Sequence, residues 1–300
     1  MIKPPSPNGG QERSGLLELH LAVLLFGGTA LFSKLIPLPA LDITVLRSAI
    51  AAVVLALLVR LGGQRLQLSR WQDYGIAMGL GITVSLHWVT YFASMQLSSV
   101  AIGMIAFFSY PVMTVLVEPL LTGTRLRAMD LVCGLAVLVG VALLIPEASL
   151  GNNVTLGIAL GVLSAALFTA RNLMHKRYFA QYSGPHAMFY QTLVAALFLA
   201  PFMQQGPGAL DSDGWQLVLL LGVAFTALPH GLFTSALRRL SAKTVGLVSC
   251  LQPLYGALLA LFILGEGLDG KTLLGGALVV ATAVFETQQS HRSRRQQKDA

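Results

Sequence analysis

Two sets of polar residues recur at intervals of four within apolar stretches of the sequence: Thr83, His87 and Tyr91, and Thr226, His230 and Thr234. In an α-helix this spacing places the members of each set on one face. An imidazole, whose pKa lies near neutrality, can bind a substrate or relay a proton. We therefore interpret His87, Tyr91, His230 and Thr234 as substrate-binding candidates. The alternative is that these groups simply form hydrogen bonds to a neighbouring helix.

A third polar stripe begins beside a proline. Tyr110, Thr114 and Glu118 are also four residues apart, and Pro111 follows the first of them. Because proline lacks an amide hydrogen, it loosens a helix, and a kinked polar helix suits a gate. Tyr110 and Thr114 are therefore binding candidates. Pro111 and Glu118 are candidates for gating or coupling, with contact to water or to Arg125 as the alternative for Glu118.

The same arrangement recurs later in the sequence, where Ser249, Gln252 and Gly256 surround Pro253. The Gln252 side chain offers a donor and an acceptor to a zwitterion. We interpret Gln252 as a binding candidate and Pro253 as a gating candidate.

Four further polar residues lie near the ends of apolar stretches. Lys34 and Arg47 fall at the ends predicted to face outward. One interpretation is that their long side chains extend to the lipid headgroups. The other is that they attract anions or act in gating or coupling, because the outer side of the membrane otherwise has few basic residues. Arg171 and Asn172 interrupt a later stretch, and we interpret them as an interfacial anchor.

The elements that must position these residues are apolar stretches of about twenty residues, long enough to cross a hydrocarbon core of about 30 Å as helices. Of the 300 residues, 55% are hydrophobic and only 11% are charged. This pattern predicts an all-α integral membrane protein with ten transmembrane helices. The predicted spans are 16–36, 41–60, 72–94, 99–121, 129–146, 154–175, 185–203, 215–237, 244–264 and 271–288.

The composition also argues against several kinds of site. The net charge of +7 comes from short basic clusters between apolar stretches, a distribution that does not favour nucleic-acid binding. Cys133 and Cys250 lie within apolar stretches and lack the spacing of metal ligands. We therefore expect no metal site, no disulfide and no cofactor. The phosphate-binding motif of ATPases is also absent.

The basic residues predict the orientation in the membrane. Seventeen of the 20 lysines and arginines fall in the terminal segments and in every second connection. The positive-inside rule then places both termini in the cytoplasm of a multi-pass cell-membrane protein, in the inner membrane if the source is bacterial. We expect a disordered tail over residues 1–15 and a basic cytoplasmic tail over residues 289–300.

The sequence also contains an internal repeat. A shift of 143 residues aligns His87 with His230, and a one-residue slip then aligns Pro111 with Pro253. The repeat contains five helices, and because five is odd, the second copy must enter the membrane from the other side. The prediction is two inverted five-helix repeats over residues 16–147 and 153–288.

Each repeat has its own ordered set of motifs. The first contains Phe26-Gly27-Gly28, Phe32-Ser33-Lys34, Arg47, and Leu97-Ser98-Ser99-Val100-Ala101 before Tyr110-Pro111. The second contains Leu240-Ser241-Ala242, Gln252-Pro253-Leu254, Leu264-Gly265-Glu266 and Gly275-Gly276. This pattern resembles the drug/metabolite transporter superfamily, specifically its ten-helix proteins with two EamA-like repeats. The resemblance implies an exporter or exchanger of metabolites, often amino acids or amphipathic compounds, that works without ATP. The first repeat departs from the pattern, because Thr122-Gly123-Thr124 lacks the acid of Leu264-Gly265-Glu266.

We therefore expect a secondary active transporter that exports or exchanges a small metabolite by alternating access. Its partners would be a small-molecule substrate and the lipid bilayer, and the protein would be a monomer or a homodimer. One alternative is a membrane-embedded enzyme, although the HExxH and GxSxG motifs are absent. The other is a non-transporting receptor or assembly factor, although long soluble loops are lacking.

Overall fold

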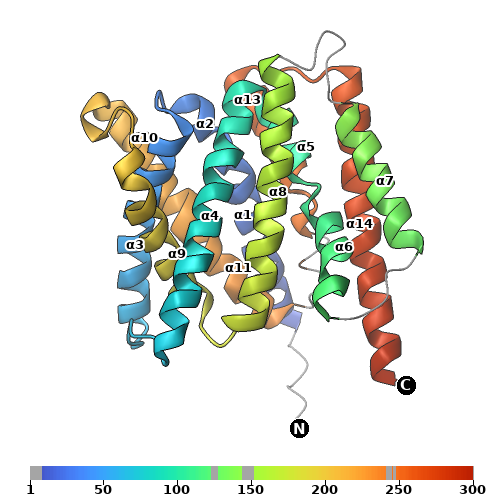
Figure 1. Cartoon of the computed structure of the whole chain (residues 1–300), viewed down its shortest axis with the longest axis horizontal. Helices are drawn as coiled ribbons and strands as arrows, with labels where there is room; N and C mark the ends of the chain where they lie inside the picture. The colour runs from blue at the N-terminus through green and yellow to red at the C-terminus, as the bar shows by residue number, and fades with distance from the viewer. Residues whose placement is uncertain (1–8, 123–127, 144–151, 241–244, 246–247, 300) are drawn as a thin grey trace.

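Figure 1 shows the fold of the chain as a computed structural model, which describes residues 9–122, 128–143, 152–240, 245 and 248–299. The first half contains α1 (Gly9–Thr29), α2 (Phe32–Leu35), α3 (Ala40–Leu61), α4 (Trp71–Leu97), α5 (Val100–Phe107), α6 (Tyr110–Thr122) and α7 (Ala128–Ala142). The second half contains α8 (Asn153–Tyr178), α9 (Gly184–Leu199), η1 (Ala200–Phe202), η2 (Pro207–Ala209), α10 (Ser212–Gly222), η3 (Val223–Ala227), α11 (Leu228–Arg239), α13 (Gln252–Leu264) and α14 (Gly270–Asp299).

Length and apolar composition identify the elements that can cross a membrane. Within the described residues, six helical segments are long and apolar enough: Arg13–Leu35, Ala40–Leu61, Trp71–Leu97, Val100–Pro119, Asn153–Tyr178 and Ser212–Phe233. Three apolar helices are shorter: Ala128–Ala142, Gln252–Leu264 and Gly270–Phe285. Together with α9, these segments correspond to the ten predicted spans. The predicted all-α membrane fold is therefore confirmed.

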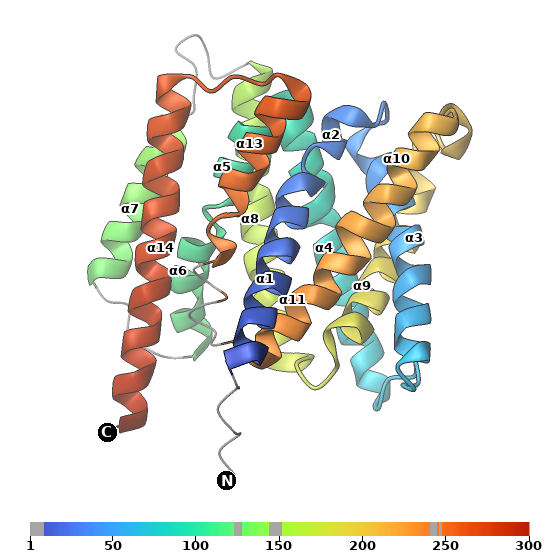
Figure 2. The same cartoon turned by 180° about the vertical axis from the view of Figure 1, so that it is seen from behind.

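The two halves run through the bundle in opposite senses. In Figures 1 and 2, α1 begins at the end of the molecule where α14 finishes, whereas α8, the first helix of the second half, begins at the other end. An odd number of spans in each half produces this inversion. Both described ends of the chain consequently lie at the same face of the bundle.

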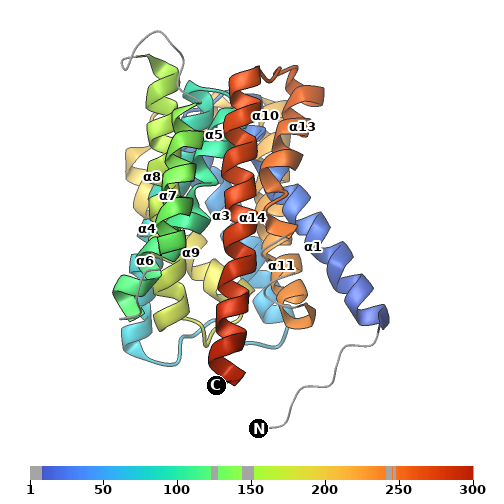
Figure 3. The same ribbon diagram turned by 90° about the vertical axis from the view of Figure 1, so that its right-hand side faces the viewer.

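Contacts between the halves follow the same symmetry. α4 packs against α8, and α1 packs against α11, which is the equivalent pair with the halves exchanged. The pairs α1 with α13 and α8 with α6 are related in the same way, because Pro253 of α13 aligns with Pro111 of α6. Two helices pack against their own counterparts: α3 against α9, and α7 against α14, the latter pair at one edge of the bundle (Figure 3). This pattern is expected for inverted repeats related by an approximate two-fold axis.

Glycines allow α1, α5 and α13 to approach closely near the centre. A Cβ atom on Gly256 of α13 would lie 2.0 Å from the Met104 sulfur of α5 and 3.2 Å from the Gly27 carbonyl oxygen of α1. A Cβ atom on Gly27 would lie 3.0 Å from the Gln252 carbonyl oxygen. Side chains at these two positions would therefore push apart helices from both halves.

Three predicted spans are interrupted in the structure. The first stops at Thr29 and resumes with α2 at Phe32. The fourth stops at Phe107 and resumes with α6 at Tyr110. The eighth contains the five-residue π-helix η3 between α10 and α11. Each interruption lies next to the cavity described below.

Part of each predicted tail is helical in the structure. α1 begins at Gly9, so residues 9–15 are helical, and residues 1–8 lie outside the described part of the chain. α14 continues to Asp299, so nearly all of the predicted basic tail is helical too. The C-terminal segment is rich in Gln, Arg and Lys, whose helix propensity is high, which explains why α14 continues beyond the apolar residues.

Candidate functional site

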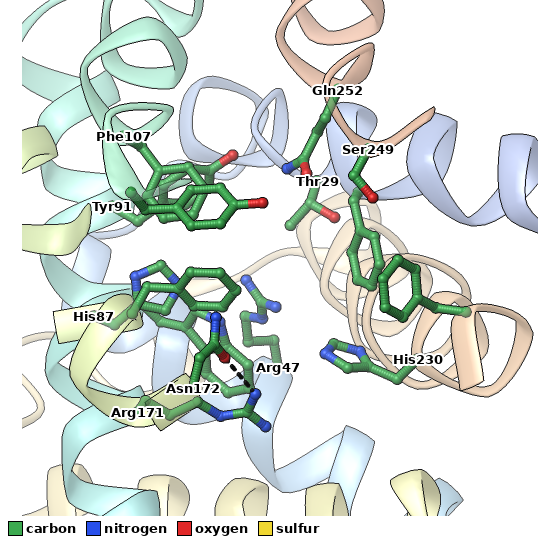
Figure 4. Close-up of a pocket in the computed structure, with 15 residues that line it drawn as sticks. Thr29, Arg47, His87, Tyr91, Phe107, Arg171, Asn172, His230, Ser249 and Gln252 are labelled. Carbon is green, nitrogen blue, oxygen red and sulfur yellow. Dashed lines mark hydrogen bonds between the residues drawn. The ribbon is translucent and has the colours of Figure 1, made fainter. Parts of the chain in front are cut away.

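A cavity of about 430 Å³ lies at the centre of the bundle (Figure 4). Its lining residues come from both halves: Phe26 and Thr29 of α1, Arg47 of α3, His87, Trp88 and Tyr91 of α4, Phe107 of α5, Tyr110 of α6, Phe168, Arg171 and Asn172 of α8, His230 and Phe233 of α11, Ser249, and Gln252 of α13. Five of the seven predicted binding residues are therefore in one cavity wall, together with Arg47.

His87 is fixed in the wall by the first helix of the other half. Its Nδ1 atom lies 2.7 Å from Ser164 Oγ, and Ser164 Oγ donates a hydrogen bond of 3.1 Å to the His87 carbonyl. The imidazole stacks on Phe107 with ring centres 5.2 Å apart and lies 4.9 Å from the Phe168 ring centre. His87 thus forms a hydrogen bond to a neighbouring helix and also lines the cavity, so the two interpretations do not exclude each other.

His230 occupies the equivalent position in the second half, and its surroundings differ. Its Nδ1 atom lies 2.6 Å from the Thr226 carbonyl oxygen, and its ring meets Phe26 edge to face at 5.0 Å. Thr226 belongs to the π-helix η3, and its hydroxyl donates to the Leu221 carbonyl at 2.8 Å. Such π-turns often occur at functional sites. Here the π-turn lies directly before the histidine.

Arg47 is buried in the cavity wall, with only 2% of its surface exposed, so it does not snorkel to the headgroups. Its guanidinium carbon lies 4.5 Å from the ring centre of Trp88 and 5.1 Å from that of Phe92. Its Nε and Nη1 atoms have no hydrogen-bond partner among the described residues. The nearby acid Asp42 is already engaged, because its carboxylate accepts hydrogen bonds from the backbone amides of residues 204–206.

The structure corrects the interpretation of Arg171 and Asn172 as an interfacial anchor, because both residues lie in the cavity wall. Its Nε donates to Gln191 Oε1 at 2.6 Å and its Nη1 to Asn172 Oδ1 at 2.9 Å, while Nη2 lies 3.1 Å from the Met188 sulfur. Gln191, a polar residue in the middle of the apolar stretch that forms α9, was not among the predicted site residues, and its polarity alone does not identify Arg171 as its partner.

The remaining polar groups of the wall surround the same space. In Figure 4 the Tyr91 hydroxyl, the Gln252 amide and the Thr29 hydroxyl lie on one side of the opening, and the two arginines lie on the other. The Thr29 Oγ1 atom is held 2.9 Å from the carbonyl oxygens of both Leu25 and Phe225. The result is a cavity with rigid aromatic walls and a few polar groups that converge on its interior.

Some predicted residues lie outside this cavity wall. The Thr114 hydroxyl donates to the Tyr110 carbonyl at 2.8 Å and is not a lining group. Glu118 pairs with Lys176 of α8, away from the cavity, and its alternative partner Arg125 lies outside the described residues. The backbone of Thr234 is part of α11, but its side chain lies outside the described part of the structure.

The two prolines predicted to act in gating lie at the starts of helices. Pro111 is the second residue of α6, and Pro253 is the second residue of α13. At these positions the missing amide hydrogen removes no intrahelical bond. The predicted kink is therefore wrong: neither proline bends a helix from within. Each lies just after the point where its span is interrupted.

Lys34 helps to clamp the connection between α4 and α5. Its Nζ atom donates to the carbonyl oxygens of Gln96 and Ser98 at 3.2 and 3.0 Å. From the other half, Glu266 Oε2 accepts the Val100 amide hydrogen at 2.9 Å. The acid of the Leu264-Gly265-Glu266 motif thus joins the second repeat to the start of a helix in the first. Among the described residues, no group of three or more His, Cys, Asp and Glu could hold a metal ion.

Known proteins resemble this chain over most of its length. It is 25% identical over 287 residues to the uncharacterized transporter YxxF of Bacillus subtilis (strain 168), covering 94% of this chain and 92% of the relative. It is 27% identical over 270 residues to the threonine/homoserine exporter RhtA of Escherichia coli (strain K12), covering 87% and 86%. A crystal structure with a TM-score of 0.65 and 20% identity covers 94% of this chain and 99% of its own, and has the same fold.

The EamA-like transporter family matches the sequence twice, over residues 13–145 and 155–287. These two segments take in both inverted halves and nearly every residue that lines the cavity. The family is one of transporters and not of enzymes, which agrees with the expectation that this chain catalyses no reaction. This chain is a membrane protein of the EamA-like transporter family, with two EamA domains, within the drug/metabolite transporter superfamily.

Proposed function

We propose that this protein is a secondary transporter that exports a small organic metabolite across the cell membrane by alternating access. One observation carries the proposal: the central cavity takes its polar lining from both inverted halves. When the halves move relative to each other, such a cavity opens to one side of the membrane and then to the other. The cavity volume also lies in the range of small-molecule sites.

The direction of transport is inferred from a relative. The Escherichia coli relative is named as a threonine/homoserine exporter. That name supports export of a metabolite of similar size by this chain. Exchange against a second solute is compatible with the same cavity, because both processes need one site that is accessible from both sides.

The orientation is part of the proposal. Among the described residues, the α3–α4 connection with Arg60, Arg65 and Arg70 and the end of α8 with Lys176 and Arg177 lie at the face of the bundle at which α1 begins and α14 ends. We propose that this face is cytoplasmic, as the positive-inside rule requires. The substrate would then enter the cavity from this face and leave at the face where α2 lies.

Each candidate residue has a proposed role. His87, Tyr91, Tyr110, His230 and Gln252 would contact the substrate in the cavity. Thr114 would position Tyr110, to whose carbonyl its hydroxyl donates, and Thr234 stays a predicted substrate-binding residue. Lys34, Glu118, Pro111 and Pro253 would act in gating or coupling, because they lie where helices begin or where the halves are joined: Lys34 at the α4–α5 connection, and Glu118 at α8 through Lys176.

Solute counterflow in liposomes tests the proposal. Purified protein would be reconstituted, the liposomes loaded with one unlabelled metabolite of a broad panel, and entry of the same labelled metabolite measured. A transporter produces saturable, transient accumulation of at least one compound, and empty liposomes produce none. Absence of counterflow across amino acids, organic acids and organic amines would contradict the proposal.

A further inference from the structure

Among the residues that the structure describes, the cavity wall contains two arginines, buried Arg47 and half-buried Arg171, and no acidic residue. Both guanidinium groups lie close enough to His87 and His230 to interact electrostatically with them. The interior therefore carries uncompensated positive charge, which is costly inside a membrane unless a negative group enters.

The two arginines differ in what they can offer a ligand. The guanidinium of Arg171 is already held by Gln191 and Asn172. Arg47 is held by the faces of Trp88 and Phe92, and two of its nitrogens have no partner among the described residues. Arg47 thus has two unpaired, buried donors in the cavity wall, on a planar group whose geometry matches a carboxylate. Arg171 adds a fixed positive field beside it.

Four acids of the described residues lie outside the wall and are engaged elsewhere. Asp42 accepts three backbone hydrogen bonds, and Glu118 pairs with Lys176. Asp73 accepts from the Tyr182 hydroxyl and Glu266 from the Val100 amide, which leaves both outside the cavity. An ammonium group in the cavity would therefore meet two cations and find no carboxylate.

The apolar part of the wall indicates the rest of the ligand. Phe107, Phe168 and Tyr110 form one continuous aromatic cluster, with ring centres 4.9 to 5.4 Å apart. Phe26 and Phe233 form a second pair from α1 and α11. Rings of this kind pack against aromatic or other flat apolar groups.

From these observations we infer that the cavity selects an organic carboxylate that has an aromatic or apolar body and no ammonium group, with Arg47 as the residue that binds the carboxylate. The inference rests on the proposed transport function and specifies its substrate class. It excludes amino acids and organic amines as preferred substrates, although the chain resembles an amino-acid exporter.

Three compounds with the same aromatic body and different charge test the inference: 3-phenylpropionate, phenylalanine and 2-phenylethylamine. Binding to the purified protein would be measured by tryptophan fluorescence, since Trp88 lines the cavity. We expect 3-phenylpropionate to bind at least about tenfold more tightly than the other two. Tighter binding of phenylalanine or 2-phenylethylamine overturns the inference, and so does absence of 3-phenylpropionate binding at millimolar concentration.

Two variants test the role of Arg47 directly. Arg47→Gln is expected to weaken 3-phenylpropionate binding by about 30-fold, because it removes one partner of a buried charged hydrogen bond. Arg60→Gln is the matched control on the same helix; Arg60 is exposed in the last turn of α3 and should leave binding unchanged. Equal affinities of Arg47→Gln and the unmodified protein overturn the assignment of Arg47.

Asn172→Asp provides a second variant that does not depend on the folding of Arg47→Gln. It places a carboxylate of nearly the same shape beside Arg171 and should shift the preference toward phenylalanine. A preference unchanged by this charge counts against the inference. If counterflow occurs with phenylalanine or the amine and not with the carboxylate, transport stands and the substrate class is wrong. If no compound of the wider panel is transported, the proposed function itself fails.

Discussion

The two cavity histidines each form a hydrogen bond within the protein and also line the cavity. His87 bonds to Ser164 of the other half, and His230 bonds to the backbone of its own π-turn. Each ring also lies at the cavity surface. Substitution should therefore affect transport more than the integrity of the fold.

We predict that His87→Gln and His230→Gln each lower the initial rate of counterflow by about tenfold, since each loses a positioned group worth about 1–3 kcal/mol. His186→Gln is the matched control, because His186 is buried and bonds to the Leu66 carbonyl, away from the cavity. Its rate should stay within twofold of the unmodified protein. Full activity of both cavity variants would remove the histidines from the site.

At the residue scale, the sequence placed His87 and Tyr91 in one stripe, and both line the cavity, whereas only Tyr110 of the third stripe does. The interpretation of Arg171 was wrong. Period-four spacing identified the face of α4 that carries His87 and Tyr91, because that spacing depends on one helix alone. Whether an arginine near a helix end faces lipid or a cavity depends on its neighbours in other helices. For Arg171 the deciding neighbour is Gln191 of α9, and no local pattern connects the two residues.

At the scale of helices, close packing of α1, α5 and α13 depends on small residues. We predict that Gly256→Val lowers the unfolding free energy by about 1–3 kcal/mol, because its side chain would overlap the Met104 sulfur. The melting temperature of the detergent-purified protein measures this effect.

Gly75→Ala is the matched control for Gly256. A Cβ atom on Gly75 would meet nothing within 4 Å, so only the helix propensity changes, in favour of alanine. Its melting temperature should be equal or slightly higher. A destabilisation as large as that of Gly256→Val would contradict the proposed packing.

The helix α5 is capped by the other half of the protein. Glu266 accepts the Val100 amide hydrogen, one of the first amides of α5, which have no acceptor within the helix. We predict that Glu266→Gln lowers stability by about 1 kcal/mol through loss of the negative charge at this helix end. Thermal unfolding measures the effect, with Arg65→Gln as the control, because Arg65 is exposed and lies in the connection between α3 and α4, outside any helix. Equal melting temperatures of the two variants would contradict this role of Glu266.

Element boundaries were only partly predictable. The apolar stretches identified the spans because the thickness of the hydrocarbon core sets their length. The break before α6 had a visible signal in Pro111, whose position at a helix start replaces the predicted kink. The break after Thr29 follows Gly27-Gly28, and the π-turn of η3 precedes Pro229, which has no amide hydrogen to donate to the Phe225 carbonyl. Neither signal was used for the predicted boundaries.

At the scale of the whole molecule, the inverted repeat was the most predictable feature. The shift of 143 residues and the odd number of spans per repeat were sufficient, because both follow from the sequence without any contact information. The symmetric helix contacts and the two EamA matches agree with it. The charge of the cavity was not predictable in this way, because Arg47 and Arg171 come from different halves and meet only in the folded protein.

The central claim is that one cavity between the halves opens to each side of the membrane in turn. Its most direct test is thiol labelling of Ser249→Cys, a cavity-lining position, in a protein with Cys133→Ala and Cys250→Ala. A membrane-impermeant maleimide would be applied to intact cells and to inside-out vesicles, with outward-facing Leu86→Cys as the control. We expect Ser249→Cys to be labelled from both sides, more slowly when a transported compound is present, and Leu86→Cys from neither. Labelling of Ser249→Cys from one side only would contradict alternating access.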